Sequence, residues 1–319
     1  MSNKKLDKFS ISIPGRICIL GDKVDLLEKP VIAATIDLMM NFNFKKCENS
    51  LITFYSHNTK EKIEFHLGDT PPRNKDLSYW SVLYERLNEK INTGFYLEVN
   101  SNIPIGRGLS TSAAISIGFL RVMNRAYGLE LRNNDIAELA FWGENHELGI
   151  QCGRMDQYSI TYGGVSFIHT DANTTVESLD IKELPMVIGD SLEDRKASSV
   201  LNRIKNQIKN KDPVTIKAFN IIEECVYGGK NALLEGNFQK LGVLMDTQQE
   251  QEVILKAETQ KIKILCQASK NAGALGAKQM GAGGGGCMIA LCPGKQEEVA
   301  KAIKDAGGKA WIFKLFNYM

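Results

Sequence analysis

The sequence predicts an α+β fold, and this expectation rests on two patterns and on the length of the chain. Strand patterns dominate the first hundred residues, and helical spacing of apolar residues dominates most of the remainder, with short β-rich runs between the helices. With 319 residues, the chain is long enough for one large domain or two ordinary ones. A polar segment at 171–177 follows the last strand pattern of the first half and is expected to be a loop, so we expect two domains, 1–180 and 181–319.

Strands are expected where apolar residues alternate or where β-branched and aromatic residues cluster. Residues 9–20 and 94–100 alternate, residues 31–44 are apolar and β-rich, and residues 50–65 resemble a hairpin with its turn near His57 and Asn58. Shorter β-rich runs follow in the rest of the chain, at 165–169, 287–292 and 309–316. Both expected domains therefore contain sheet-forming segments.

Helices are expected where apolar residues recur every three or four positions. In the segment 79–92, Trp80, Leu83, Tyr84 and Leu87 follow this spacing. Seven further segments are expected to be helical, at 112–126, 134–148, 194–209, 213–235, 237–245, 256–272 and 295–306. An Ala/Gly-rich stretch at 268–277 also suggests a helix, which would precede a glycine cluster.

The composition excludes several classes of protein. Apolar residues make up 43% of the chain, charged residues 24%, and the net charge is +2, so we expect a soluble globular protein with neither a nucleic-acid nor a membrane partner. The apolar runs fall short of the roughly 20 residues that a membrane span requires. Seven cysteines without a CxxC pair, and no signal peptide, indicate reduced thiols in the cytoplasm. The four histidines lack HxxxH spacing, so a structural zinc site is not supported.

The segment Pro104–Ala114 carries the strongest functional signal. It follows the strand pattern at 94–100, contains Gly106, Gly108 and three consecutive hydroxyl residues at 110–112, and leads into an apolar helical run. Glycines allow backbone N–H groups to converge on an anion, and a helix N-terminus favours negative charge. One hydroxyl would suffice to cap the helix, which is the alternative role for this segment. The segment therefore indicates a site for nucleotide phosphates, although GxxxxGK[ST] is absent.

Three other segments concentrate polar residues or glycine. Residues 14–25 run from an apolar strand into Gly21-Asp22-Lys23-Val24-Asp25, and residues 144–157 end a helix in a glycine-bounded loop with carboxylates at both ends. Structural alternatives are a solvated turn for the first and charges at a helix end for the second. The cluster at 281–286 matches GxGxxG, but it precedes a strand and follows a helix pattern, the reverse of the dinucleotide-binding order. A flexible hairpin is its alternative.

In combination, these segments resemble the GHMP kinase superfamily, which includes galactokinase, homoserine kinase, mevalonate kinase and phosphomevalonate kinase. PGRICILGDKVD is similar to the first family motif, PIGRGLSTSAA to the phosphate loop, and GAKQMGAGGGGCMIA to the third motif. The resemblance spans nearly the whole chain. It implies a ribosomal-protein-S5-domain-2-like N-terminal domain that binds ATP and a ferredoxin-like C-terminal GHMP kinase domain.

The resemblance also implies a site for ATP and Mg²⁺. The residues expected at the nucleotide are Gly106, Gly108, Leu109, Ser110, Thr111, Ser112, Ala113, Gly283 and Gly284. Ser112 and Glu144 match the Mg²⁺ ligands of the family, and oxygen ligands suit this ion. Asp156 is the expected catalytic base, and Arg16 would keep Asp156 ionised and steady the transferring phosphoryl group.

The expected acceptor is a hydroxyl of a small molecule bound by Asp22, Lys23, Asp25 and Gly153. CGRMDQ resembles the CG-x-MDQ loop of galactokinases, and GLSTSAA resembles their GLSSSA, which favours a sugar. The galactokinase segment GEHTDY is GDKVDL here, which leaves galactose itself open.

Two alternatives to a sugar kinase follow from other features. AGALGAKQMGAGGGGCMIAL equally resembles an archaeal-type mevalonate kinase, in which Lys23 could meet a substrate carboxylate. Lys23 could also pair with an acidic sugar such as a uronic acid, or it could simply neutralise Asp22 or Asp25. A catalytically inactive sugar sensor is the alternative from another class. For quaternary structure we expect a monomer or a homodimer.

Overall fold

The computed structural model describes residues 7–74, 77–194 and 196–318, and its contacts divide the chain into two units. Unit 1 contains the described residues up to 15, then 38–104 and 110–161, and unit 2 contains 16–37, 105–109 and 162 onward. This division differs from a single boundary near residue 180, because the chain enters unit 2 twice before residue 110. Each unit combines strands with helices, so the predicted α+β class is confirmed.

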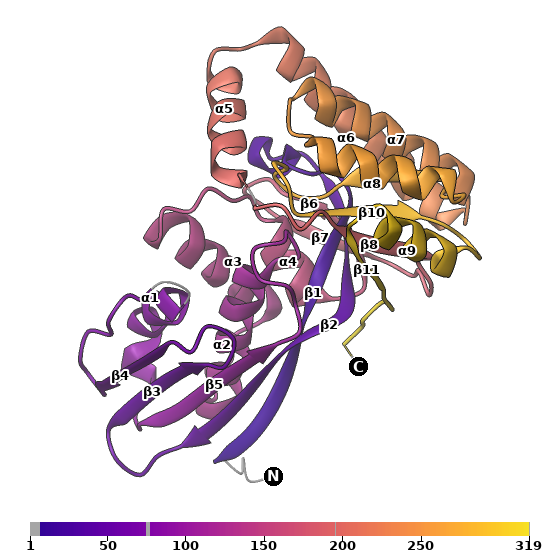
Figure 1. Cartoon of the computed structure of the whole chain (residues 1–319). Coiled ribbons are helices and arrows are strands. Elements are labelled where there is room, and N and C mark those ends of the chain that lie inside the picture. Colours follow the sequence, from indigo (N-terminus) through magenta and orange to yellow (C-terminus); the bar gives the residue numbers. More distant parts are fainter. Residues whose placement is uncertain (1–6, 75–76, 195, 319) are drawn as a thin grey trace. The chain divides into compact units, whose positions relative to one another are not determined.

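The strands of unit 1 hydrogen-bond in the order β4-β3-β5-β2 (Figure 1). The bounds of the first five strands are β1 Lys8–Leu20, β2 Val31–Lys46, β3 Leu51–Ser56, β4 Lys62–His66 and β5 Phe95–Ser101. β3 and β5 are parallel, whereas β3/β4 and β2/β5 are antiparallel. The predicted hairpin at 50–65 is thereby confirmed. β1 and β2 are long strands that contribute residues to both units.

The helices of unit 1 are α1 Ser78–Leu87, η3 Asn88–Lys90, α2 Thr111–Tyr127, α3 Asn133–Trp142, the π-helical turn η4 Gly143–Glu147 and α4 Met155–Tyr162. Aromatic side chains join them to the sheet. Trp80 of α1 lies 5.2 Å from Phe54 of β3 and 6.2 Å from Phe119 of α2, measured between ring centroids. The Trp80 indole N–H also donates to the carbonyl of Ile115 at 2.9 Å. This core fixes the helix whose first turn carries Ser112.

Unit 2 contains two groups of strands. β2 continues through β6 Val165–His169 to β7 Thr175–Leu179 in antiparallel pairing. A separate four-stranded sheet has the order β11-β8-β10-β9. Its strands are β8 Met186–Asp190, β9 Gly276–Gln279, β10 Cys287–Leu291 and β11 Lys309–Ile312, and all neighbours are antiparallel.

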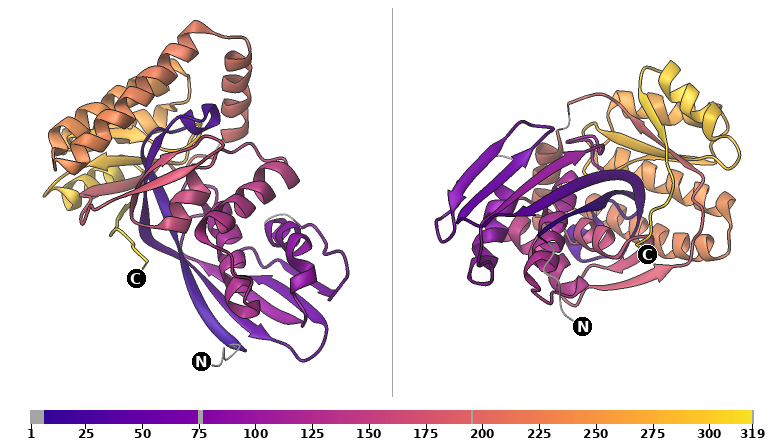
Figure 2. Two further views of the ribbon diagram at one scale, coloured as in Figure 1. Left: turned by 180° about the vertical axis from the view of Figure 1, so that it is seen from behind. Right: turned by 90° about the horizontal axis from the view of Figure 1, so that it is seen from below.

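The helices of unit 2 are η1 Val24–Leu27, α5 Ala197–Lys209, α6 Pro213–Leu234, α7 Phe238–Ile254, α8 Gln260–Asn271 and α9 Gln296–Asp305. The long helices α6 and α7 lie side by side, and α8 and α9 pack together against the four-stranded sheet (Figures 1 and 2). The Asp212 side chain caps α6 by accepting from the Thr215 N–H, and Pro213 occupies the first turn. No helix in the described ranges has the length and apolarity to cross a bilayer.

Four elements of unit 2 differ from the expectation. β7 covers part of the segment at 171–177 that we expected to be a loop. The strand was missed because its sequence is mostly polar, and Leu179 is its only fully buried side chain. β8 was not anticipated. β9 lies where an Ala/Gly-rich helix was expected, and with four residues it is too short to show a period. α7 continues to Ile254, whereas we expected it to end at 245. The second half was missed because its buried face carries the polar residues Gln248 and Glu252 instead of apolar ones.

Gly118 of α2 offers a test of the unit 1 core. A Cβ built at this position would lie 2.0 Å from the Phe42 ring. We expect Gly118→Ala to destabilise the protein by about 1–3 kcal/mol, because overpacking would outweigh the helix propensity of alanine. Urea-induced unfolding measures the change. Gly228→Ala in α6 is the matched control, since its new methyl group would meet only the flexible end of Leu244 at 3.2 Å. Equal effects of the two substitutions would contradict the prediction.

Candidate functional site

The N-terminus of α2 has the features of an anion site. Ser110 precedes the helix in the left-handed region, with φ at 61°, and its side chain makes no capping hydrogen bond. Among the described residues, the buried Ser110 hydroxyl oxygen has no hydrogen-bond partner. The N–H groups of Thr111, Ser112 and Ala113 lie in the first turn, where a helix offers them no backbone acceptor. Helix capping therefore does not account for Ser110, and these groups can together bind a phosphate.

The preceding loop, residues 105–109, belongs to unit 2 and is held there by Arg16. Gly106 and Gly108 have φ values of 72° and 87°, a region in which glycine carries no steric cost. The Arg16 guanidinium donates to the Gly108 carbonyl at 2.7 Å, and the Arg16 backbone N–H lies 3.4 Å from the Leu109 carbonyl oxygen. Arg16 is 3% exposed. It therefore fixes the backbone of the loop that we expect to meet the phosphates.

Arg107 is a second anchor of this loop, and sequence reasoning missed it. Its guanidinium donates to the Glu193 carbonyl at 2.5 Å and lies 3.5 Å from the Asp190 carboxylate. Its own carbonyl accepts from the Cys287 N–H at 3.1 Å. An arginine between two glycines was the available signal. Arg107 thus ties the loop to the strands β8 and β10.

The glycine cluster 281–286 forms the turn between β9 and β10, where Met280 N–H donates to the Cys287 carbonyl at 2.9 Å. The predicted order of helix, loop and strand is therefore wrong, and a strand stands on each side. Gly283 has φ at 80°, and a Cβ there would lie 2.6 Å from the Ala257 carbonyl oxygen. At Gly284 the nearest backbone atom, from Lys196, would lie at 3.2 Å. Packing within unit 2 thus requires Gly283, whether or not a nucleotide binds nearby.

Asp22 and Lys23 lie in a buried cluster of charges. The Asp22 carboxylate pairs with Lys278 of β9 and accepts from the Gln248 amide at 2.9 Å. Lys23 Nζ lies 2.6 Å from the Glu252 carboxylate of α7. Asp22, Glu252 and Lys278 are fully buried, and Lys23 is 4% exposed. The two ion pairs bring together β9, α7 and the turn that follows β1.

The cluster changes how these groups titrate. Burial alone would raise the pKa of Asp22, but the charges of Lys278 and Lys23 outweigh it and hold that pKa below its usual value. Burial would lower the pKa of Lys278, and the Asp22 carboxylate reverses this shift and raises it. For Glu252, burial raises the pKa, and Lys23 counteracts only part of the shift.

The cluster also bears on the expected substrate residues. A substrate could reach Asp22 or Lys23 only by breaking a buried ion pair, so the two side chains are placed to hold structure rather than to meet a ligand. Asp25, the other expected substrate residue of this segment, is half-buried in the first turn of η1.

In unit 1, Glu144 lies in the π-helical turn η4 and is 5% exposed. Its carboxylate accepts from the Gln157 amide at 2.8 Å. Asp156 lies in the first turn of α4 and is half-buried, whereas we expected it in a loop. Gly153 lies in the irregular segment before this helix. π-Helical turns are rare and are frequently found at functional sites, and Glu144 therefore stays a candidate ligand.

Arg154 and Tyr158 orient the start of α4, and sequence reasoning missed both. The Arg154 guanidinium donates to Glu138 of α3 at 2.8 Å and lies 4.3 Å from the centroid of the Phe141 ring. The Tyr158 hydroxyl donates to the same carboxylate at 2.7 Å. These contacts anchor both sides of Asp156 to α3. Glu138 precedes Arg154 by 16 positions and Tyr158 by 20 positions, and no local sequence pattern connects residues that far apart.

The oxygen groups of unit 1 fit Mg²⁺. α2, which carries Ser112, contacts the turn η4, which carries Glu144. The Gln157 side-chain oxygen nearby is buried and has no hydrogen-bond partner among the described residues. The described part of the chain holds no group of three or more His, Cys, Asp or Glu side chains suited to a metal. A hydroxyl and one carboxylate, supplemented by phosphate oxygens and water, are a donor set that Mg²⁺ accepts.

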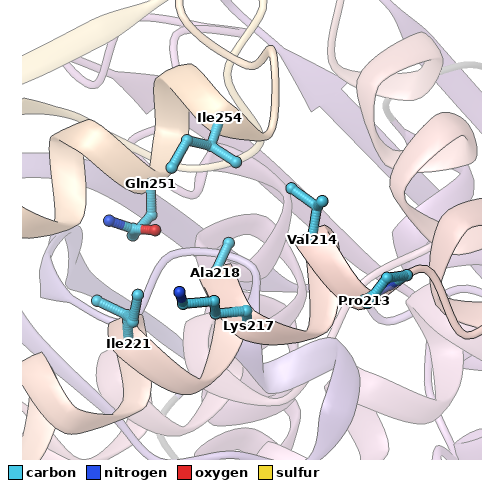
Figure 3. A pocket seen from close by; sticks show the side chains of 7 residues that line it. All are labelled: Pro213, Val214, Lys217, Ala218, Ile221, Gln251 and Ile254. Atoms are coloured by element: carbon cyan, nitrogen blue, oxygen red, sulfur yellow. The ribbon is translucent and has the colours of Figure 1, made fainter.

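A groove of about 470 Å³ lies elsewhere in unit 2, along α6 and α7 (Figure 3). Its lining is mostly apolar and consists of Pro213, Val214, Lys217, Ala218, Ile221, Gln251 and Ile254. None of the residues expected at the nucleotide, metal or acceptor is among them. The groove therefore gives no information about the predicted site.

Comparison with known proteins agrees with this geometry. Residues 78–164 match the family model of the GHMP kinase N-terminal domain, and residues 230–310 match that of the GHMP kinase C-terminal domain. A mevalonate kinase from Pyrococcus furiosus is 30% identical over 97% of this chain and 96% of its own length. A galactokinase from the same organism is 24% identical over 97% and 95% of the two chains.

A solved structure shares the fold. The galactokinase of Lactococcus lactis complexed with galactose superimposes with a TM-score of 0.84 at 20% identity, covering 98% of this chain and 95% of that one. The two family models and the near full-length relatives lead to one conclusion: the chain belongs to the GHMP kinase superfamily and is a kinase.

Proposed function

We propose that this kinase transfers the γ-phosphoryl group of ATP to a hydroxyl of a small metabolite, with Mg²⁺ as cofactor. The observation that carries the proposal is the uncapped start of α2. There the Ser110 hydroxyl has no partner within the described part of the chain, and the first-turn N–H groups are available to phosphate. Arg16 supports it by fixing the adjoining loop at the Gly108 carbonyl. Phosphoryl transfer depends mostly on such positioning and on neutralisation of charge.

Of the two acceptors, mevalonate is at least as well supported as a sugar, and we propose it first. Identity to the mevalonate kinase relative is 30%, against 24% for the galactokinase, over similar shares of the chain. The CGRMDQ and GLSTSAA segments favour a sugar, so the two observations point to different acceptors. Galactose remains the second candidate because those two segments resemble galactokinases. Lys23 is not proposed to bind the carboxylate of mevalonate, because Glu252 already pairs with it.

The proposed chemistry assigns a role to each expected residue. Asp156 accepts the proton of the acceptor hydroxyl as the new O–P bond forms. Ser112 and Glu144 would hold Mg²⁺, which neutralises phosphate charge when bound. Gln157 holds the Glu144 carboxylate through its 2.8 Å hydrogen bond. Arg16 holds the loop and offers positive charge to the transferring group. Asp25 and Gly153 stay candidates for acceptor contact.

An acceptor panel tests the proposed function. ADP release from Mg-ATP is measured with mevalonate, galactose, other neutral sugars and uronic acids. We expect strong turnover with mevalonate. If only galactose gave strong ADP release, galactose would replace mevalonate as the proposed acceptor, and the proposed phosphoryl transfer from ATP would stand. ATP binding without turnover on any acceptor would contradict the proposed acceptors and favour a sensor.

Asp156→Asn tests the base. An amide of the same shape cannot accept the proton, so we expect turnover to fall by roughly 10²–10⁴-fold while ATP affinity stays within about twofold. Steady-state kinetics and equilibrium nucleotide binding measure the two quantities. Glu147→Gln, an exposed carboxylate at the end of η4, is the control and should retain full activity. Wild-type turnover of Asp156→Asn would eliminate this role.

Ser112→Ala tests the metal site. Loss of the hydroxyl ligand should raise the Mg²⁺ concentration for half-maximal activity by at least about tenfold. A magnesium titration at fixed ATP measures this. Ser116→Ala lies one turn further along α2, where the hydroxyl donates to the Ser112 carbonyl, and should leave the titration unchanged. Identical titrations for both variants would show that Ser112 does not hold the metal.

A further inference from the structure

Gly281, the first residue of the glycine turn, is held on both sides of its backbone by two consecutive residues. Its N–H donates to one oxygen of the Asp22 carboxylate. Its carbonyl accepts from Lys23 Nζ at 2.8 Å. Asp22 and Lys23 therefore form a clamp on the backbone of Gly281.

Each side chain of the clamp has a buried counter-ion of its own. Lys278, three residues before Gly281, pairs with Asp22, and Glu252 of α7 lies 2.6 Å from Lys23. Two amides complete the cluster. Gln248 donates to Asp22 at 2.9 Å, and Gln279 donates to Glu252 at the same distance. The cluster contains two positive and two negative groups, so it is neutral as a whole.

The backbone around the clamp is also restricted to one conformation. Lys23 has φ at 70°, which is unfavourable for a residue with a side chain, and Gly21 has φ at 99°. The Gly21 N–H donates to the Gln248 side-chain oxygen at 2.9 Å. This strained turn persists because the two ion pairs and the contacts to Gly281 over-determine it.

The clamp is connected to the phosphate loop through backbone hydrogen bonds within unit 2. Gly281 opens the turn that Met280 and Cys287 close at 2.9 Å. The Cys287 N–H then donates to the Arg107 carbonyl at 3.1 Å, between Gly106 and Gly108. A shift of Gly281 would therefore be transmitted to the loop that precedes Ser110.

We infer that Asp22, Lys23, Glu252 and Lys278 are positioning residues for the nucleotide rather than ligands of the acceptor. The inference rests on the proposed function in so far as the loop at 105–109 meets ATP. The clamp fixes the glycine turn, and the turn fixes the loop through Arg107. Removing the clamp should weaken ATP binding and leave acceptor binding intact.

Hydrogen exchange of the ligand-free protein tests the clamp without reference to catalysis. Lys23→Met removes the donor to the Gly281 carbonyl, so amides in 280–287 should exchange faster than in the wild type. Lys29→Met is the matched control, because Lys29 forms a half-buried pair with Glu223 in the same unit. Unchanged exchange in 280–287 of Lys23→Met would overturn the inference, whatever the enzyme phosphorylates.

A second variant separates positioning from stability. Lys23→Met leaves Glu252 buried without its partner, which is costly. Lys23→Met/Glu252→Gln removes both charges, and we expect it to regain most of the lost thermal stability. The Gly281 carbonyl still lacks its lysine, so the KM for ATP should stay raised by roughly three- to thirtyfold. The KM for the acceptor should match the wild-type value.

These measurements also tell the inference apart from the proposed function. A double variant with wild-type KM for ATP, or with a raised KM for the acceptor alone, would overturn the positioning role. Absence of ATP binding by the wild type would contradict the proposed function instead, and the exchange measurement would still decide whether the clamp holds the turn.

Discussion

The arrangement of β9, α7 and the turn after β1 in unit 2 depends on the pairing of buried charges. A carboxylate or an ammonium group removed from water is tolerated only beside an opposite charge, and the ion pairs Asp22–Lys278 and Lys23–Glu252 meet that requirement between segments up to 256 residues apart in sequence. Such pairs add little net stability compared with apolar packing. Their effect is selective, because any other register of β9, α7 and the first turn would leave a charge alone.

The backbone of this protein differs in how far internal contacts hold it in place. Gly283 has no room for a Cβ because Ala257 lies against it, and Lys23 keeps a positive φ because its Nζ is bound at two places. The start of α2 has the opposite property, since Ser110 and the first-turn N–H groups have bonds left to make. The glycine turn and Lys23 are thus held by contacts within the protein, whereas the start of α2 can still accept hydrogen bonds from, or donate them to, an anion and its surroundings.

Most helices and the long strands could be predicted from sequence, because their apolar periodicity is long enough to be distinctive. β9 and the second half of α7 could not, since four residues show no period and the buried amides of Gln248 and Gln279 look like surface residues. The candidate phosphate site was predicted from the glycines and hydroxyls at 104–114, which are visible in the sequence. Lys278 and Glu252 were not, because their importance comes from partners that only the tertiary structure brings near.

The topology of unit 2 has a consequence for the order in which the chain can fold. Residues 35–36 pair with residues 315–316, through the Thr35 hydroxyl to the Phe316 carbonyl at 2.6 Å and a bridge between Ile36 and Leu315. Contacts of such sequence separation slow folding, because a long loop must close before they form. During synthesis, the strand β2 would leave the ribosome well before its last partner exists. Unit 2 therefore cannot be completed until residues 315–316 have been synthesised, and until then the edge of β2 lacks its last partner.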